Sequence, residues 1–194
     1  PFGSKHGSVQ IVTFTVTDDS GNTSSCQSKV TLKDNEKPSI NCAGLTTGLF
    51  VTPPVCGHTV VAGDNVNPSF SDNCSGAVRT HNFAPAPSEH TLEGAILPVG
   101  TTTVIWTITD AGGNTATCEV TYTVTDNVAP VFENCPDDVT LSNDPGKCGA
   151  AVFWLAPVAE DDCGETVTQT GGPAPGFFFQ ISDSPYTIEY TATD

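Results

Sequence analysis

One strand–turn–strand motif recurs along this chain, and its recurrence constrains the fold more than any other feature of the sequence. In the copy at residues 106–118, apolar β-branched and aromatic residues alternate with threonines, a period of two that is typical of half-buried strands. The turn at residues 110–114 reads Asp-Ala-Gly-Gly-Asn, in which Gly and Asn tolerate a positive φ and Asp caps the backbone. Residues 14–26 match this copy position by position, and residues 190–194 repeat its beginning. The motif therefore predicts a β-protein built from repeats.

Other motifs recur at nearly the same spacing and give the length of the repeat. Cys118 lies 92 residues after Cys26, and the Asp-Asn-x-x-Pro linker at Asp126 lies 92 residues after the one at Asp34. A repeat of about 85–92 residues has the length of a β-sandwich rather than of a short solenoid unit.

These spacings divide the chain into three parts. Residues 1–33 are expected to be the C-terminal part of one repeat, residues 34–125 a complete repeat, and residues 126–194 a repeat that lacks its last strand. Two interpretations stay open. The chain is an excerpt from a long tandem array, or it is a circularly permuted subunit that assembles head to tail, the N-terminal segment of one copy completing the open repeat of the next by strand complementation.

The complete repeat shows several short alternating patterns separated by loops rich in proline and glycine, and no segment keeps a helical period over a dozen residues. The fold class is therefore expected to be all-β. The predicted strands lie near 38–42, 57–62, 78–83, 89–96, 102–109 and 115–125.

The composition narrows the classes of partner and the compartment. The chain has 22 acidic and 6 basic residues and a formal net charge of −16. Such a chain would be repelled by nucleic acid and by an anionic membrane but is compatible with divalent cations. No apolar stretch is long enough to cross a bilayer. Eight cysteines without a metal-binding spacing predict disulfides and an extracellular location.

The four cysteines of the complete repeat allow three pairings. Cys42 ends the first expected strand and Cys118 lies near the start of the last. In an immunoglobulin-like sandwich these edges can be neighbours, so we expect a Cys42–Cys118 disulfide. This pairing leaves Cys56 for Cys74, which would close a short loop.

The other repeats have incomplete sets of cysteines. By the same reasoning Cys148 is expected to pair with Cys163. Cys26 and Cys135 then each need a partner outside the chain. In the permuted-subunit interpretation they pair with each other across neighbouring copies, which the repeat spacing permits without requiring.

Five motifs in a fixed order carry a resemblance to a known family. They are Asp-Asn-x-x-Pro-x-(Ile/Phe) followed by Cys after one residue at 34–42 or two residues at 126–135, Asp-Pro-Gly-Lys-Cys-Gly at 144–149, Asp-Asn-Cys at 72–74, Leu-Pro-Val-Gly-Thr at 97–101, and Thr-Asp-x-x-Gly-Asn-Thr-x-x-Cys. Together they resemble the hyalin repeat (HYR) domain over the whole chain, with a departure at 171–179, where a long segment rich in Pro, Gly and Phe replaces the usual turn. The resemblance implies tandem immunoglobulin-like β-sandwiches, an extracellular role in adhesion, and no catalytic activity.

Acidic residues recur at the linkers, at the strand–turn motif and before one cysteine of each repeat. Hard oxygen ligands gathered at such places suit Ca²⁺, which takes six to eight of them, and a bound ion would stiffen the array. The alternative is that these acids only cap turns and solvate a hinge. The predicted metal ligands are Asp34, Asp72, Asp110, Asp126, Asn127, Glu160, Asp161 and Asp162.

Three consecutive aromatic residues, Phe177, Phe178 and Phe179, cannot all face one core, so they form a candidate contact patch for neighbouring repeats, other copies, surface glycans or proteins. The alternative is a bulge that covers the end of the sandwich.

The sequence contains no nucleophile elbow, no His-Glu-x-x-His zinc motif and no phosphate-binding glycine loop, so no catalytic residue is predicted. The function that fits best is a non-catalytic structural and adhesive module of an extracellular fibre or large surface protein. A carbohydrate-binding accessory module of a secreted enzyme is the alternative, and it requires exposed aromatic rings in a row.

Overall fold

The computed structural model describes residue 7, residues 9–84 and residues 86–194 of the chain. Apart from one short helical turn, η1 (Ile181–Asp183), the described elements are all strands, which confirms the all-β fold class. None of the helical structure in these residues is long and apolar enough to cross a membrane. The strands are β1 (Val9–Thr17), β2 (Thr23–Thr31), β3 (Ser39–Asn41), β4 (Gly48–Phe50), β5 (His58–Thr59), β6 (Ser69–Ser71), β7 (Val78–His81), β8 (Ile96–Leu97), β9 (Gly100–Thr109), β10 (Thr115–Thr125), β11 (Val131–Asn134), β12 (Gly149–Ala151), β13 (Val158–Glu160), β14 (Thr166–Gly171), β15 (Phe178–Gln180) and β16 (Glu189–Thr193).

The first two strands form an antiparallel hairpin whose register matches that of β9 and β10. Phe14 lies opposite Cys26 in the hairpin, as Trp106 lies opposite Cys118 in the later pair. At the hairpin turn the carboxylate of Asp18 accepts hydrogen bonds from the backbone N–H groups of Ser20 and Asn22. The recurring sequence motif thus folds into the same local structure twice.

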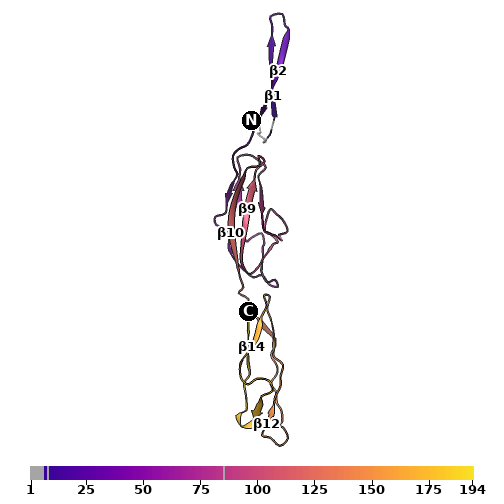
Figure 1. Ribbon diagram of the computed structural model, residues 1–194, viewed down its shortest axis with the longest axis vertical. Coiled ribbons are helices and arrows are strands. Elements are labelled where there is room, and N and C mark those ends of the chain that lie inside the picture. Colours follow the sequence, from indigo (N-terminus) through magenta and orange to yellow (C-terminus); the bar gives the residue numbers. More distant parts are fainter. Residues whose placement is uncertain (1–6, 8, 85) are drawn as a thin grey trace. The chain divides into compact units, whose positions relative to one another are not determined.

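The central part of the chain contains a four-stranded sheet in the order β4-β10-β9-β7 (Figure 1). On β9 the alternate residues Val104, Trp106 and Ile108 are fully buried, so the period of two in the sequence marks the inner face of the sheet. The other buried side chains of this core come from β4, β8 and β10 and from the segments around Val60, Val66 and Leu92. Fully burying one such aliphatic or aromatic side chain contributes about 1.5–3 kcal/mol.

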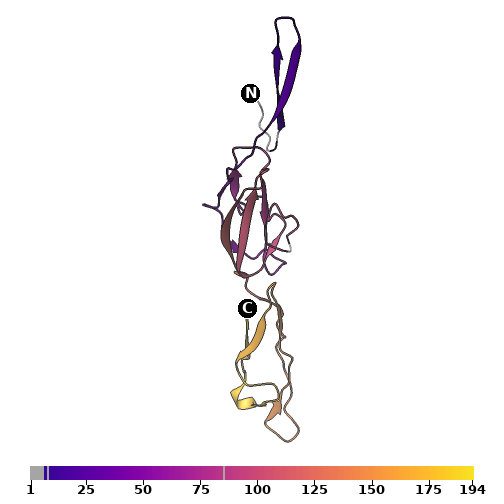
Figure 2. The same ribbon diagram turned by 45° about the horizontal axis from the view of Figure 1, so that its top comes forward.

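The last part of the chain repeats three of these pairings. The pairs β11–β13, β12–β15 and β14–β16 correspond in sequence order to β3–β6, β5–β8 and β7–β9 (Figures 1 and 2). Among the described residues no strand corresponds to β4 or to β10 in this part. The two missing counterparts belong together, because β4 pairs with β10 in the central sheet.

One strand expected from the sequence is absent. Residues 89–96 form a looped segment that becomes a strand only at β8, because side-chain oxygens of Ser88 and Thr91 bind the backbone N–H groups of His90 and Glu93. Gly94 then reverses the chain at φ 79°. The short strands β4 and β6 were not expected, since three residues are too few to show a period of two.

The chain divides into two compact units whose boundary differs from that of the sequence repeats. The first unit contains Pro1–Leu49 and His58–Val124, and the second contains Phe50–Gly57 and Thr125–Asp194. The loop 50–57 therefore belongs with the last part of the chain, although the repeat pattern assigned it to 34–125. Within the second unit Val51 donates a backbone hydrogen bond to the carbonyl of Thr125.

Candidate metal centres and disulfides

Three acidic side chains converge in the first unit. Asp34 precedes β3 in the linker, Asp72 directly follows β6, and Asp110 directly follows β9. One carboxylate oxygen from each lies within 4.8 Å of the other two. Asp110 is only 5% exposed, and the other two are half-buried. The fold thus concentrates three negative charges at one place, an arrangement that a divalent cation would stabilise.

The turn of the recurring motif holds Asp110 in place. Asn114 donates its backbone N–H and its side-chain amide to the two carboxylate oxygens, each at 2.8 Å. Desolvation raises the pKa of the Asp110 carboxyl, but the hydrogen bonds from Asn114, Gly112 and Gly113 outweigh it and lower the pKa below its ordinary value. This carboxylate therefore stays ionised, as a metal ligand must.

One oxygen of Asp72 has no hydrogen-bond partner in the described structure. Its Oδ2 accepts the backbone N–H of Cys74 at 3.2 Å, whereas its Oδ1 is buried without a partner. A buried carboxylate oxygen normally has a partner, so an orphaned one beside two further carboxylates is an observation that fits a cation.

The thiol of Cys74 also belongs to this acidic site. A hydrogen bond to Asp34, desolvation and the negative charges of Asp34, Asp72 and Asp110 raise the pKa of this thiol. Cys74 is therefore a neutral thiol beside the carboxylates.

The second unit contains a similar group made from the equivalent residues. Carboxylate oxygens of Asp126 and Asp161 lie within 4.8 Å of each other and of the sulfur of Cys163. Asp161 Oδ1 accepts the backbone N–H of Cys163 at 2.8 Å, as Asp72 does for Cys74, and its Oδ2 is likewise buried without a hydrogen-bond partner. The sulfur of Cys163 is bonded in a disulfide and so is not available as a thiolate ligand.

Four other acidic or amide residues lie outside these two groups. Asn127 and Glu160 are exposed, and Asp162 is half-buried next to Asp161. Asp194, the counterpart of Asp110 in the repeat pattern, is exposed. Of the eight predicted ligands the structure brings together Asp34 with Asp72 and Asp110, and Asp126 with Asp161.

The described residues form two disulfides, of which one was expected. Cys42 is bonded to Cys118, as the positions of the first and last strands suggested. Cys56 is bonded to Cys163, so the expected pairings Cys56–Cys74 and Cys148–Cys163 are both wrong.

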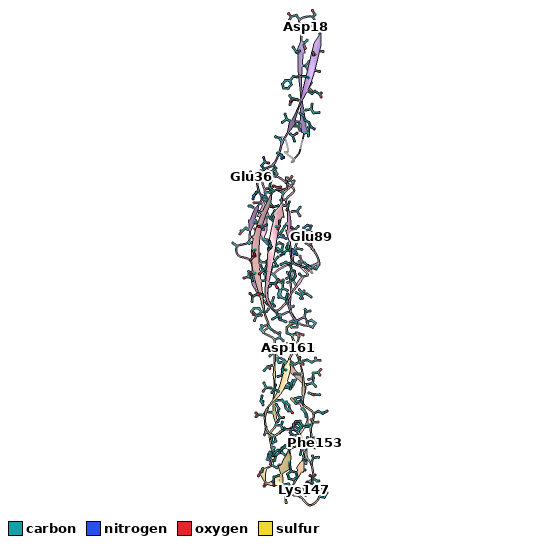
Figure 3. All side chains as sticks on the ribbon, in the orientation of Figure 1. Asp18, Glu36, Glu89, Lys147, Phe153 and Asp161 are labelled. Atoms are coloured by element: carbon teal, nitrogen blue, oxygen red, sulfur yellow. A yellow bond between two sulfur atoms is a disulfide. The ribbon has the colours of Figure 1, made fainter. Side chains whose placement is uncertain are left out.

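The position of the acidic group explains why Cys163 does not pair within its own repeat. Cys163 lies beside Asp161, and Cys148 lies beside Lys147, and Figure 3 shows Asp161 and Lys147 at opposite ends of the second unit. One feature of the sequence pointed to this separation. If Asp161 joins Asp126, then Cys163 must lie near the linker that follows β10, and therefore away from Cys148.

Within the described residues four cysteines are free. Cys26, Cys135 and Cys148 are exposed, and Cys74 is half-buried.

The candidate contact patch at residues 177–179 is only partly exposed. Phe177 is 48% exposed, whereas Phe178 and Phe179 are half-buried on β15. The ring of Phe179 contacts those of Tyr186 and Trp154 edge to face, with centroids 4.6 and 6.1 Å apart. The segment therefore has features of both interpretations: Phe179 packs against neighbouring rings, as in a bulge that covers the end of the sandwich, and Phe177 is exposed, as in a contact patch.

An acidic, disulfide-bonded all-β chain with recurring carboxylate groups defines the class, an extracellular repeat module. A family model described as the HYR domain matches residues 33–124 and 125–194. The chain therefore belongs to the HYR domain family, and it is an extracellular or cell-surface protein.

Two curated relatives are similar over nearly the whole chain. Hyalin of Strongylocentrotus purpuratus is 31% identical over 189 residues, which cover 94% of this chain and 15% of that protein. Hyalin of Lytechinus variegatus is 29% identical over 188 residues, which cover 95% of this chain and 33% of that protein. The chain thus spans one third or less of the length of these relatives.

Among solved structures, the extracellular cadherin domains 1–5 of protocadherin gamma B2 are similar at a TM-score of 0.39 and 15% identity, covering 95% of this chain and 44% of that one. Cadherin domains 1–4 of protocadherin gamma B7 are similar at a TM-score of 0.32 and 14% identity, covering 95% of this chain and 56% of that one.

Proposed function

We propose that this chain is a non-catalytic structural segment of an extracellular fibre or large surface protein, in which Ca²⁺ bound by the acidic groups fixes each linker to the repeat that follows it. The observation that carries the proposal is the convergence of Asp34, Asp72 and Asp110 within 4.8 Å, with a buried oxygen of Asp72 that has no hydrogen-bond partner. Asp126 and Asp161 repeat the arrangement. Carboxylate oxygens on loops suit Ca²⁺, because that ion accepts flexible oxygen coordination.

A cation at these groups would act on the linker. Asp34 and Asp126 belong to the linker segments, and their acidic partners belong to the repeats that follow. Binding that is available only in the folded arrangement stabilises it by mass action, about 2.7 kcal/mol when the free ion is at 100 times its dissociation constant. The chain's own residues would contribute ligands and position; no bond is made or broken.

Calcium titration tests this proposal. The chain is titrated by calorimetry, and its thermal unfolding is compared in Ca²⁺ and in a chelator. We expect saturable binding and a higher unfolding temperature in Ca²⁺. Asp72→Asn and Asp161→Asn should each weaken binding at one group, whereas Asp162→Asn, which changes the neighbouring residue outside the group, should not. Unchanged unfolding in Ca²⁺ and in chelator would refute the role of the ion.

We further propose that neighbouring repeats or copies complete one another by strand complementation. Leu141, which matches the buried Leu49 of β4, is 60% exposed in the second unit. Val30 of β2 and Leu32, one residue past its end, match the inward-facing Tyr122 and Val124 of β10, and both are exposed. A β2 strand added beside β16 would supply the pairing that β10 supplies to β9.

Sedimentation velocity tests complementation between copies. Because side chains alternate along a strand, Val30 and Thr31 face opposite sides of β2. We expect concentration-dependent association that Val30→Glu abolishes and Thr31→Glu preserves. A chain that stays monomeric at every concentration, or equal association of both variants, would refute assembly between copies.

The carbohydrate-binding alternative gains no specific support. It requires exposed aromatic rings in a row, whereas the half-buried Phe179 packs edge to face against the half-buried Trp154 and Tyr186.

A further inference from the structure

The disulfide between Cys56 and Cys163 joins two sequence repeats, since Cys56 lies in the segment 34–125 and Cys163 in the segment 126–194. It lies beside an acidic group, because the Cys163 sulfur is within 4.8 Å of carboxylate oxygens of Asp126 and Asp161. The disulfide between the two repeats thus lies beside a candidate cation site.

The free thiol of Cys74 has the surroundings of Cys163. Each cysteine donates its backbone N–H to the aspartate two residues before it, at 3.2 Å to Asp72 and at 2.8 Å to Asp161. Each also lies by the aspartate of the preceding linker, Asp34 for Cys74 and Asp126 for Cys163. Cys74 therefore occupies the position that Cys163 has in the Cys56–Cys163 disulfide, but it has no sulfur bonded to it.

The free thiol of Cys148 lies on a loop with the backbone hydrogen bonds of the Cys56 loop. Thr52 N–H donates to the carbonyl of Gly57. Asp144 and Gly149, each 92 positions later, make the same hydrogen bond. Val55 N–H donates to Thr52, and Lys147 N–H donates to Asp144 in the same way. The two loops thus present Cys56 and Cys148 on equivalent turns.

The internal partners that the sequence suggested for these thiols are excluded by the structure. Cys56 and Cys163 are already bonded to each other. Cys148 and Cys163 also lie near opposite ends of the second unit, as the labelled neighbours Lys147 and Asp161 show in Figure 3.

From these equivalences we propose that Cys74 and Cys148 are half-cystines of further disulfides of the Cys56–Cys163 kind, each made with an adjacent HYR repeat. Cys148 bonds a cysteine of the following repeat, the one equivalent to Cys74 and Cys163. Cys74 bonds a cysteine of the preceding repeat, the one equivalent to Cys56 and Cys148. The proposal rests on the tandem-array function given above and names its partner, another HYR repeat. Each consecutive pair of repeats is then joined by one disulfide beside one acidic group.

The bond forms by thiol–disulfide exchange. The two cysteine thiols lose two protons and two electrons as the S–S bond forms, and a small-molecule disulfide such as oxidised glutathione accepts both electrons and is reduced to two thiols. One cysteine thiolate attacks oxidised glutathione and releases one glutathione thiol, and the second cysteine thiolate then attacks this mixed disulfide and releases the other glutathione.

The test is a fusion of two copies that continues the repeat in register. Because Asp194 matches Asp18, the second copy begins at Asp19 directly after Asp194 of the first. Cys74→Ser in the first copy and Cys148→Ser in the second leave one thiol of each kind, Cys148 in the first copy and Cys74 in the second. After refolding in a glutathione redox buffer, non-reducing peptide mapping should find these two peptides linked.

The matched control fusion carries the two substitutions in the opposite copies. It keeps the same number of cysteines but leaves Cys74 in the first copy and Cys148 in the second, so no adjacent repeat presents the partner within one chain. We expect these two thiols to be alkylated by iodoacetamide. In the unfused wild-type chain, the same linked peptides in a covalent dimer would support a second copy as the partner.

A Cys148–Cys163 or Cys56–Cys74 link in the first fusion would overturn the proposal, as would alkylation of both remaining thiols there. Calcium titration of the same fusion separates the two ideas. A linked fusion that binds no Ca²⁺ refutes only the cation role, and an unlinked fusion that binds Ca²⁺ refutes only the disulfide.

Discussion

The central and the last parts of the chain have the same sequence motifs and three corresponding strand pairs, yet they differ in how well they bury their apolar residues. Leu49 is 5% exposed and its counterpart Leu141 is 60% exposed. Trp106 is fully buried, whereas its counterpart Tyr190 is half-buried. The difference follows from a single element, because only the central part contains β10.

Strand β10 supplies both a layer of side chains and a pairing edge. Its inward residues Val120, Tyr122 and Val124 are buried, and Tyr122 also donates a hydrogen bond to the carbonyl of Val66. The same strand pairs with β4. In the last part the residues that match β4 form no strand, whereas the loop 144–149 keeps the hydrogen bonds of its counterpart. The comparison teaches that local turns form without the last strand but the core does not.

The largest expected difference between the two parts is at the matched pair Trp106 and Tyr190. Trp106→Ala should cost about 3–5 kcal/mol, because it empties a fully buried site. Tyr190→Ala should cost less than half as much, since that ring is only half-buried and its hydroxyl loses the hydrogen bonds from Trp154 and to Gln169. Hydrogen exchange with mass spectrometry measures both, on peptides from β9 and from β16. Equal losses of protection would show that the last part is packed as well as the central one.

The next effect is at the matched leucines. Leu49→Ala should destabilise its unit by about 2–4 kcal/mol, and Leu141→Ala should change stability by no more than about 0.5 kcal/mol, as exposed substitutions do. The two tryptophans make the measurement specific, because Trp106 lies in the first unit and Trp154 in the second. Urea unfolding is followed by fluorescence in backgrounds with Trp154→Phe or Trp106→Phe, each background serving as its own reference. A large effect of Leu141→Ala would mean that another element covers this residue in solution.

A smaller effect separates the members of the aromatic patch. Phe179 corresponds to the fully buried Leu97 of β8 but is itself half-buried. Phe179→Ala should cost about 1–2 kcal/mol by the loss of its contacts with Trp154 and Tyr186. Phe177→Ala should stay within about 0.5 kcal/mol. Thermal unfolding measures both, and the reverse order would place Phe177 in the core.

The smallest effect at neutral pH concerns Asp110 in a metal-free buffer. Its pKa is lowered by hydrogen bonds in the folded state, so its stabilising contribution is present above the ordinary carboxyl pKa of about 3.9 and is lost as the pH falls through the lower folded value. Asp110→Asn should therefore flatten the decline of stability below about pH 4.

Urea midpoints between pH 3 and pH 7 test this, with the exposed Glu119→Gln on β10 as the control. The matched change Asp194→Asn should leave the profile unaltered, because that side chain is exposed and lies outside the acidic groups. A profile for Asp110→Asn that follows the unmodified chain would contradict the assignment.

Local patterns in the sequence predicted the long strands β9 and β10, the turns and the family. Alternation marked the inner faces of β9 and β10, and Asp-x-x-Gly-Asn turns fixed the hairpins, because both depend on residues close together in the chain.

Three features became known only from the folded chain: the disulfide between Cys56 and Cys163, the division of the acidic residues into two groups, and the packing of the loop 50–57 with the second unit. These features depend on which distant segments lie side by side. A repeat pattern assigns residues to copies of a motif but carries no information on whether a loop packs with its own copy or with the next one. Cys56 packs with the next one, so its partner Cys163 lies outside the three pairings that the four cysteines of the complete repeat allow.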